Sequence, residues 1–299
     1  MLRKALKWVL WALVALVVVV AALVAWNWDL IQRTALGGVH VYEAVPPQLP
    51  AEVKRPAILV FSKTNGFRHE EAIPAANAMF AAVAKQKGWG YFQTENGATF
   101  SPAILSRFDA VVFNNVSGDV FTPDQRKAFK AFIENGGGFV GIHAAGDDSS
   151  RDWTWYLKDV IGAQFIGHPM NPQFQEATVK VEDRTHPATR GLPASWKRTD
   201  EWYSFDKPTR QPGYHVLLTL DESSFANHKM FGKDLAMGAD HPIAWWHCVG
   251  KGRVLYSGLG HQASAYAEPL YRGMLTEAVD WSLHGRECAA PAPATETPK

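Results

Sequence analysis

The hydrophobic pattern of the chain begins with one long apolar segment. Residues 8–26 read WVLWALVALVVVVAALVAW and contain no charged side chain, and this length suits a helix that crosses a bilayer. The apolar h-region of a secretory signal peptide is typically shorter, so we expect an uncleaved anchor rather than a cleaved signal peptide. The flanking bases Arg3, Lys4 and Lys7 lie before the segment. The positive-inside rule therefore predicts a cytoplasmic N-terminus and a periplasmic or extracellular domain.

After this segment the pattern changes to short apolar runs that alternate with stretches of helical spacing. We expect strands at 57–61, 91–94, 109–114, 139–143, 178–182, 214–220, 242–246 and 253–257, and helices at 71–87, 122–135 and 268–283. Thr122, Pro123 and Gln125 form a helix-start signature, because threonine can cap the helix, proline fits its first position and glutamine completes the capping box. Strands that alternate with helices predict an α/β fold with a doubly wound, mostly parallel sheet.

These patterns divide the chain into five parts. They are a cytoplasmic tip (1–7), a transmembrane helix (8–26), a linker (27–55), one α/β domain (56–285) and a disordered tail (286–299). Prolines 46, 47 and 50 are expected to stiffen the end of the linker. The two cysteines, Cys248 and Cys288, could form a disulfide in an exported domain, but the sequence does not show whether they are close.

The composition excludes several classes of partner. The chain has 30 Lys and Arg against 29 Asp and Glu, a formal net charge of +1, so it lacks the basic surface that nucleic-acid binding requires. It has neither a P-loop nor a Gly-x-Gly-x-x-Gly after the first strand, which argues against nucleotide chemistry. The 12 Trp are expected mainly in the core, although aromatic rings beside polar groups also stack on sugars.

Several histidines follow predicted strands. In doubly wound sheets, ligands bind beyond the carboxyl ends of the strands. His69 lies in the loop after the first strand, His143 ends the strand at 139–143, and His261 follows the strand at 253–257. We expect these three side chains to meet in one cleft and to be catalytic. Glu201 is their expected carboxylate partner, and Asp147 is a further catalytic candidate because on a helix it would share a face with His143.

A second group of residues is assigned to substrate binding. It comprises His168, Trp153, Tyr203 and His241, which lie in loops or beside polar segments. The alternative for a single loop histidine is a surface or satisfied core position. For His241 a structural turn before a strand is nearly as good an interpretation.

Seven segments resemble the trehalose-utilisation (ThuA-like) family, whose fold is similar to that of class I glutamine amidotransferases. They occur in family order over residues 56–285 and read FSKTNGFRH (61–69), GGGFVGIHA (136–144), GHP (167–169), TDEWY (199–203), LDE (220–222), DHPIAW (240–245) and GRVLYSGLGH (252–261). Amidotransferases place a nucleophilic cysteine after a strand, whereas the corresponding strand here ends in His143. We therefore do not expect glutaminase activity.

The resemblance implies action on a carbohydrate, trehalose or a related disaccharide, including oxidised (3-keto) sugars. A keto group acidifies the neighbouring C–H, which His143 or His261 could deprotonate with Glu201 as partner. Isomerisation, elimination and hydrolysis all remain open. In a second hypothesis the site binds zinc or another divalent ion, with candidate ligands His69, His143, His168, His261 and Glu201. In a third, the domain is a non-catalytic carbohydrate-binding module.

Overall fold

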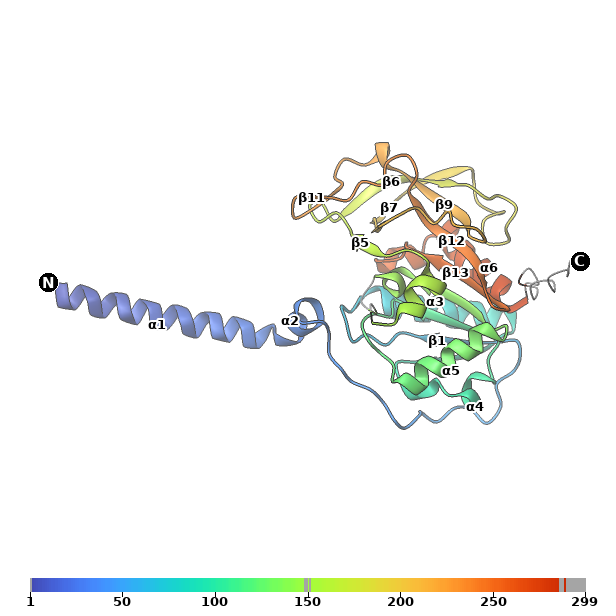
Figure 1. Cartoon of the computed structure of the whole chain (residues 1–299), viewed down its shortest axis with the longest axis horizontal. Helices are drawn as coiled ribbons and strands as arrows, with labels where there is room; N and C mark the ends of the chain where they lie inside the picture. The colour runs from blue at the N-terminus through green and yellow to red at the C-terminus, as the bar shows by residue number, and fades with distance from the viewer. Residues whose placement is uncertain (1, 148–149, 151, 285–287, 289–299) are drawn as a thin grey trace, which may run out of the picture.

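The N-terminal segment forms a long helix that extends away from the rest of the chain (Figure 1). The computed structural model describes residues 2–147, 150, 152–284 and 288. Helix α1 (Leu2–Trp26) is exposed along its length, and it is long and apolar enough to cross a membrane. The predicted linker is not irregular throughout, because residues Trp28–Ala35 form a second helix, α2.

Five parallel strands form one half of the central sheet. Their order is β2-β1-β3-β4-β13, with bounds β1 Ala57–Phe61, β2 Gly90–Thr94, β3 Ala110–Asn114, β4 Gly138–Ile142 and β13 Gly252–Ser257. Every residue of β1, β3 and β4 is buried, as their continuous apolar runs predict for strands covered on both faces. The expected doubly wound parallel sheet is confirmed.

Four antiparallel strands extend this sheet beyond β13. They follow in the order β12-β9-β6-β7, with bounds β12 Pro242–Val249, β9 His215–Asp221, β6 Phe174–Val181 and β7 Ser195–Glu201. Short strand pairs lie outside the main sheet, namely β5 (Phe165–Gly167) with β8 (Ser204–Phe205), and β10 (Lys229–Met230) with β11 (Lys233–Asp234). The extension brings the polar strand β7 into the same sheet as the buried parallel strands.

Helices pack against the parallel half of the sheet. Their bounds are α3 Ala72–Lys87, α4 Pro102–Leu105, α5 Pro123–Glu134 and α6 Pro269–His284. Helix α3 contacts α6, and α4 contacts α5. The start of α5 is the predicted capping box, in which the Thr122 side chain accepts a hydrogen bond from the Gln125 amide and the Gln125 side chain accepts one from the Thr122 amide.

Helix α2 and the segment that follows it are bound to the domain. Arg33 of α2 donates a hydrogen bond to the carbonyl of Thr64 at 2.7 Å, and Thr64 belongs to the loop that also carries His69. The buried Lys63 ammonium forms an ion pair with Glu43 at 2.5 Å. The predicted linker is therefore packed against the loop after β1 rather than acting as a free spacer.

A disulfide joins Cys248 of β12 to Cys288, which lies beyond α6. The Cα atoms are 5.4 Å apart, within the usual range for such a bond. This answers the question that the sequence left open. Apart from Cys288, the predicted disordered tail lies outside the described residues.

Candidate active site

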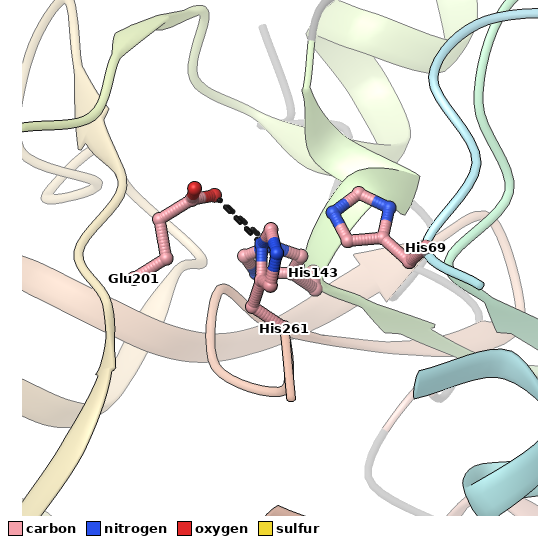
Figure 2. A group of neighbouring side chains, drawn as sticks. All are labelled: His69, His143, Glu201 and His261. Carbon is pink, nitrogen blue, oxygen red and sulfur yellow. Dashed lines mark hydrogen bonds and ion pairs between the residues drawn. The ribbon is translucent and has the colours of Figure 1, made fainter. Parts of the chain in front are cut away.

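Three histidines and one glutamate meet at the edge of the sheet where the parallel strands end. His69 follows β1, His143 follows β4, His261 follows β13, and Glu201 is the last residue of β7. One nitrogen or oxygen atom from each lies within 4.8 Å of the others. Figure 2 shows the three rings gathered on one side and the carboxylate directed toward His143 and His261. We call these four residues the histidine cluster. The predicted strand ends account for the meeting of the three histidines, whereas Glu201 comes from a strand that was not predicted.

His143 occupies the tight turn that follows β4. Its φ is +49°, in the left-handed region that residues with a Cβ rarely adopt, and such conformations concentrate at functional sites. The side chain is fully buried, and Nδ1 lies 2.8 Å from the carbonyl of Gly258. Because a carbonyl oxygen can only accept, this contact assigns a proton to Nδ1. In the neutral ring, Nε2 is then an acceptor.

Glu201 is the centre of the polar contacts in the cluster. Its Oε2 lies 3.3 Å from Nε2 of His143 and 3.1 Å from Nδ1 of His261. Its Oε1 lies 3.1 Å from Nδ1 of His168 and accepts a hydrogen bond from the side-chain amide of Gln173. Both oxygens of this buried carboxylate are therefore engaged from several sides.

The surroundings favour an ionised glutamate and a neutral His69. Burial alone would raise the pKa of Glu201, but its contacts with His143 and His261 outweigh this effect and lower that pKa. Burial lowers the pKa of His69 well below its usual value, and the neighbouring His143 and His261 act in the same direction. Burial also lowers the pKa of His168, although Glu201 opposes this effect. The cluster thus combines a carboxylate with at least one imidazole whose nitrogen can accept a proton or a cation.

Asp200 fixes the loop that carries His261. Its carboxylate is fully buried and accepts hydrogen bonds from the backbone amides of Gly260 at 2.8 Å and His261 at 3.1 Å. Arg198, two residues earlier on β7, donates to the same carboxylate at 3.0 Å. Sequence reasoning noted Asp200 only as a neighbour of Glu201, and it missed Gln173 entirely. The Asp-Glu pair at the end of a charged, alternating segment is the one signal that could have identified the supporting role.

Aromatic rings line the cluster. Tyr203 is buried and lies against His143 with ring centroids 4.1 Å apart. Phe174 meets His261 at 4.9 Å, and Phe67 meets His69 at 5.0 Å, both edge-to-face. Phe67 is 40% exposed, so it is available to a ligand. Sequence reasoning included Tyr203 but missed both phenylalanines.

Two other predicted residues lie outside the cluster. Asp147 ends the short turn that begins at His143. Burial and the charge of Glu201 raise the pKa of Tyr203, and the charge of Asp147 acts in the same direction. Trp153 packs against Tyr156 and Phe121 at the edge of the aromatic core. These contacts favour the core-packing alternative for Trp153.

His241 belongs to a separate pair. Its Nδ1 lies 2.7 Å from Glu222 and its Nε2 lies 2.8 Å from the carbonyl of Tyr203. Glu222 also accepts hydrogen bonds from the backbone amides of Met237 and Gly238, at 2.7 and 2.8 Å. Although burial alone would raise the pKa of Glu222, these hydrogen bonds lower it. The geometry favours the structural alternative for His241, because the ring joins the segment before β12 to Glu222 and to the backbone at Tyr203.

Comparisons with known proteins agree with this fold. The family described as Trehalose utilisation (ThuA) matches residues 57–282. A ThuA-like protein from Bacteroides uniformis is 26% identical and superposes with a TM-score of 0.67 over 82% of this chain and 98% of its own. A second, from Parabacteroides merdae, is 16% identical with a TM-score of 0.57 over 78% and 91% of the respective chains. Among curated proteins no sequence matches this chain. The chain therefore belongs to the trehalose-utilisation (ThuA) family.

Proposed function

We propose that the histidine cluster is the catalytic centre of an enzyme that acts on a sugar or glycoside, trehalose or a related disaccharide, including its 3-keto form. The observation that carries this proposal is the convergence of three imidazoles and one carboxylate, from four distant segments, at the carboxyl ends of the strands. Perturbed, mutually contacting ionisable groups in such a position are typical of catalytic sites. Membership of the family supports a carbohydrate as the substrate class.

The chemistry we propose is proton transfer next to a sugar carbonyl. A keto group acidifies the adjacent C–H, and an imidazole with a carboxylate partner can remove that proton. His143 is fully buried, whereas the side chains of His261 and His168 are 15% and 20% exposed, and all three contact Glu201. The partly exposed His261 and His168 are thus better placed than His143 to reach a substrate. The buried His143 orients Glu201 and His261 on the side away from solvent.

The test is turnover of 3-keto-trehalose by the purified full chain. We expect product formation by the wild type and a loss of at least about 100-fold in His143→Ala, because acid–base groups typically contribute that much and His143 orients them through its contacts with His261 and Glu201. His284→Ala is the matched control, because this exposed histidine lies at the end of α6, away from the cluster. Equal turnover by His143→Ala and the wild type would refute the assignment.

A non-catalytic carbohydrate-binding module is the second candidate. The exposed ring of Phe67 beside His69 favours it, because aromatic faces and edges also bind sugars that are not converted. The two candidates differ in the state of the recovered ligand. An enzyme releases a changed sugar, whereas a binding module returns the same sugar unaltered.

We also propose that α1 anchors the domain to a membrane, with residues 1–7 in the cytoplasm and the domain outside. The support is the apolar length of α1, the bases before it, and the disulfide, which is typical of exported domains. The mass of the protein recovered from membranes tests this. An intact N-terminus is expected, whereas a chain shortened after about residue 25 would identify a cleaved signal.

A further inference from the structure

Protons cannot satisfy all the contacts within the histidine cluster at once. Nδ1 of His143 donates its proton to Gly258, which leaves Nε2 of the neutral ring as an acceptor. That Nε2 lies 3.3 Å from the Oε2 atom of Glu201, which is also an acceptor. Nδ1 of His261 is 3.1 Å from both atoms and can donate one proton to only one of them. A buried contact between two lone pairs then remains, and a second proton on His143 would only move the mismatch to a contact of His261. No placement of protons satisfies all three contacts, whereas a cation between the atoms would.

The distances fit a metal ion in this position. The atoms Nε2 of His143, Nδ1 of His261 and Oε2 of Glu201 form a triangle with sides of 3.1, 3.1 and 3.3 Å. Metal–ligand bonds of 2.0–2.1 Å in a tetrahedral site place neighbouring ligands about 3.3 Å apart. The triangle therefore has about the size of one face of such a site.

His69 supplies a fourth donor. Its ligand atom lies within 4.8 Å of those of the other three residues, and one of its ring nitrogens faces them in Figure 2. The ring is buried and packs edge-to-face on both His143 and His261 at 4.9 and 4.5 Å. A small rotation of this ring would bring its nitrogen toward the centre of the group.

Outer partners hold the ligands in place. Gly258 orients His143, while Gln173 and His168 contact the second oxygen of Glu201. Hydrogen bonds of this kind are usual around metal ligands because they fix the tautomer of the imidazole and the direction of the carboxylate.

We propose that His69, His143, His261 and Glu201 bind one divalent transition-metal ion. Three imidazoles and one carboxylate suit zinc, iron, nickel or copper better than magnesium or calcium, which prefer oxygen ligands. The role of the ion rests on the proposed function, since it would polarise the carbonyl oxygen of a keto sugar. His168 is not one of the four ligands and would then accept the proton, with Glu201 beside it.

The test is metal binding by the full chain, purified in detergent without a histidine tag and freed of metal by chelation. Zn²⁺, Ni²⁺ and Mg²⁺ are titrated separately, and binding is followed by calorimetry and by elemental analysis after gel filtration. We expect one equivalent of Zn²⁺ or Ni²⁺ per chain and no binding of Mg²⁺. Loss of an outer partner of a metal site costs about 10–100-fold in affinity, so His69→Gln, His143→Gln and Glu201→Gln are expected to lose at least about 100-fold.

His215→Gln is the control, because this histidine is exposed on β9 and its loss should leave the stoichiometry and affinity unchanged. The circular dichroism spectrum of each variant shows that it is folded. The metal proposal is overturned if the wild type binds none of the transition metals, or if all three cluster variants bind them as tightly as it does. In the first case an additional proton, rather than a metal, relieves the contact between His143 and Glu201.

Metal binding and turnover can fail independently. Full turnover of 3-keto-trehalose by metal-free protein would overturn the proposed role of the ion in the reaction and leave the enzymatic function standing. One bound equivalent without conversion of any keto sugar would support the metal site and contradict the proposed function.

Discussion

Among the described residues, a histidine meets a glutamate in two buried groups, and the groups differ in whether protons can satisfy all their contacts. In the His241–Glu222 pair both ring nitrogens face acceptors, and Glu222 receives two further backbone amides. Each of these contacts joins one ring nitrogen to one oxygen, so a proton on the nitrogen satisfies it. In the histidine cluster, Nε2 of His143, Nδ1 of His261 and Oε2 of Glu201 lie 3.1–3.3 Å from one another, and no placement of protons gives all three contacts both a donor and an acceptor. We call the His241–Glu222 group the matched pair.

This difference separates a structural role from a functional one. A buried ionic pair with all its hydrogen bonds made holds one segment against another, and removing one partner leaves an uncompensated charge. A buried group with unmatched acceptors lowers stability until a proton, a cation or a ligand completes it. The sequence does not show which buried partners His143 and His241 have, so only the positions of those partners separate the two roles.

The largest effect is expected on turnover, from removing the charge of Glu201. Glu201→Gln keeps the shape of the side chain but neither pairs with an imidazolium nor binds a cation strongly. We expect turnover of 3-keto-trehalose to fall about 1,000-fold, or about 4 kcal/mol in transition-state stabilisation. Initial rates at saturating and limiting substrate measure this loss.

Glu222→Gln is the matched control for that comparison. Its effect on the rate per folded molecule should stay within about twofold, because Glu222 contacts the segment before β12 and not the cluster. Similar losses of rate in the two variants would remove the distinction between the groups.

The next effect concerns stability and the matched pair. His241→Phe removes the donor between Glu222 and Tyr203 and leaves a mostly buried carboxylate without its histidine partner. We expect the free energy of unfolding to fall by about 3 kcal/mol. Urea denaturation followed by circular dichroism measures it, and a change below about 1 kcal/mol would contradict a structural role.

His247 offers a third case, a buried histidine that bonds to a backbone carbonyl. Its Nε2 donates to the carbonyl of Asp159 at 2.8 Å, and burial lowers its pKa to about 4. The unfolded state, with a pKa near 6.5, binds more protons between these values. The stabilisation is therefore complete above about pH 6.5 and is lost as the pH falls toward 4, by up to about 3 kcal/mol.

Unfolding free energies measured from pH 7 to pH 4.5 test this slope. His247→Gln should flatten it, although His69 and His168, whose pKa values are also lowered, will leave some dependence. An unchanged slope in the variant would show that His247 is not responsible.

The smallest effect isolates the backbone of His143. Because its φ is +49°, a residue with a Cβ is unfavourable there by about 1–2 kcal/mol, whereas glycine is not. We expect His143→Gly to be about 1 kcal/mol more stable than His143→Ala in urea denaturation, with both inactive. Equal stabilities would show that this backbone conformation imposes no cost.

The parallel half of the fold could be predicted because its strands are continuous apolar runs. The segments at 57–61 and 139–143 contain few polar residues, and burial on both faces requires that composition. Strand β7 was not predicted, because it reads SWKRTDE and buries the charged side chains of Arg198 and Asp200. Their burial depends on pairing with each other and with the loop at His261, which no local pattern reveals.

The candidate site was predictable only in part for the same reason. Histidines that follow parallel strands must lie at one edge of the sheet, so His69, His143 and His261 could be grouped by topology alone. Gln173 and Phe174 reach the cluster from the antiparallel extension, whose register was not predicted. His241 was grouped with the substrate-binding residues because its partner Glu222 could not be located from the sequence.

The free energy of unfolding of metal-free Glu201→Gln, compared with Glu222→Gln, tests the central claim most directly. The amide nitrogen in Glu201→Gln can donate to Nε2 of His143, while its oxygen keeps the donors His168 and Gln173. We predict that this variant is at least as stable as the wild type, whereas Glu222→Gln loses about 2 kcal/mol. A loss in Glu201→Gln as large as that in Glu222→Gln would mean that the histidine cluster is a structural pair like its neighbour.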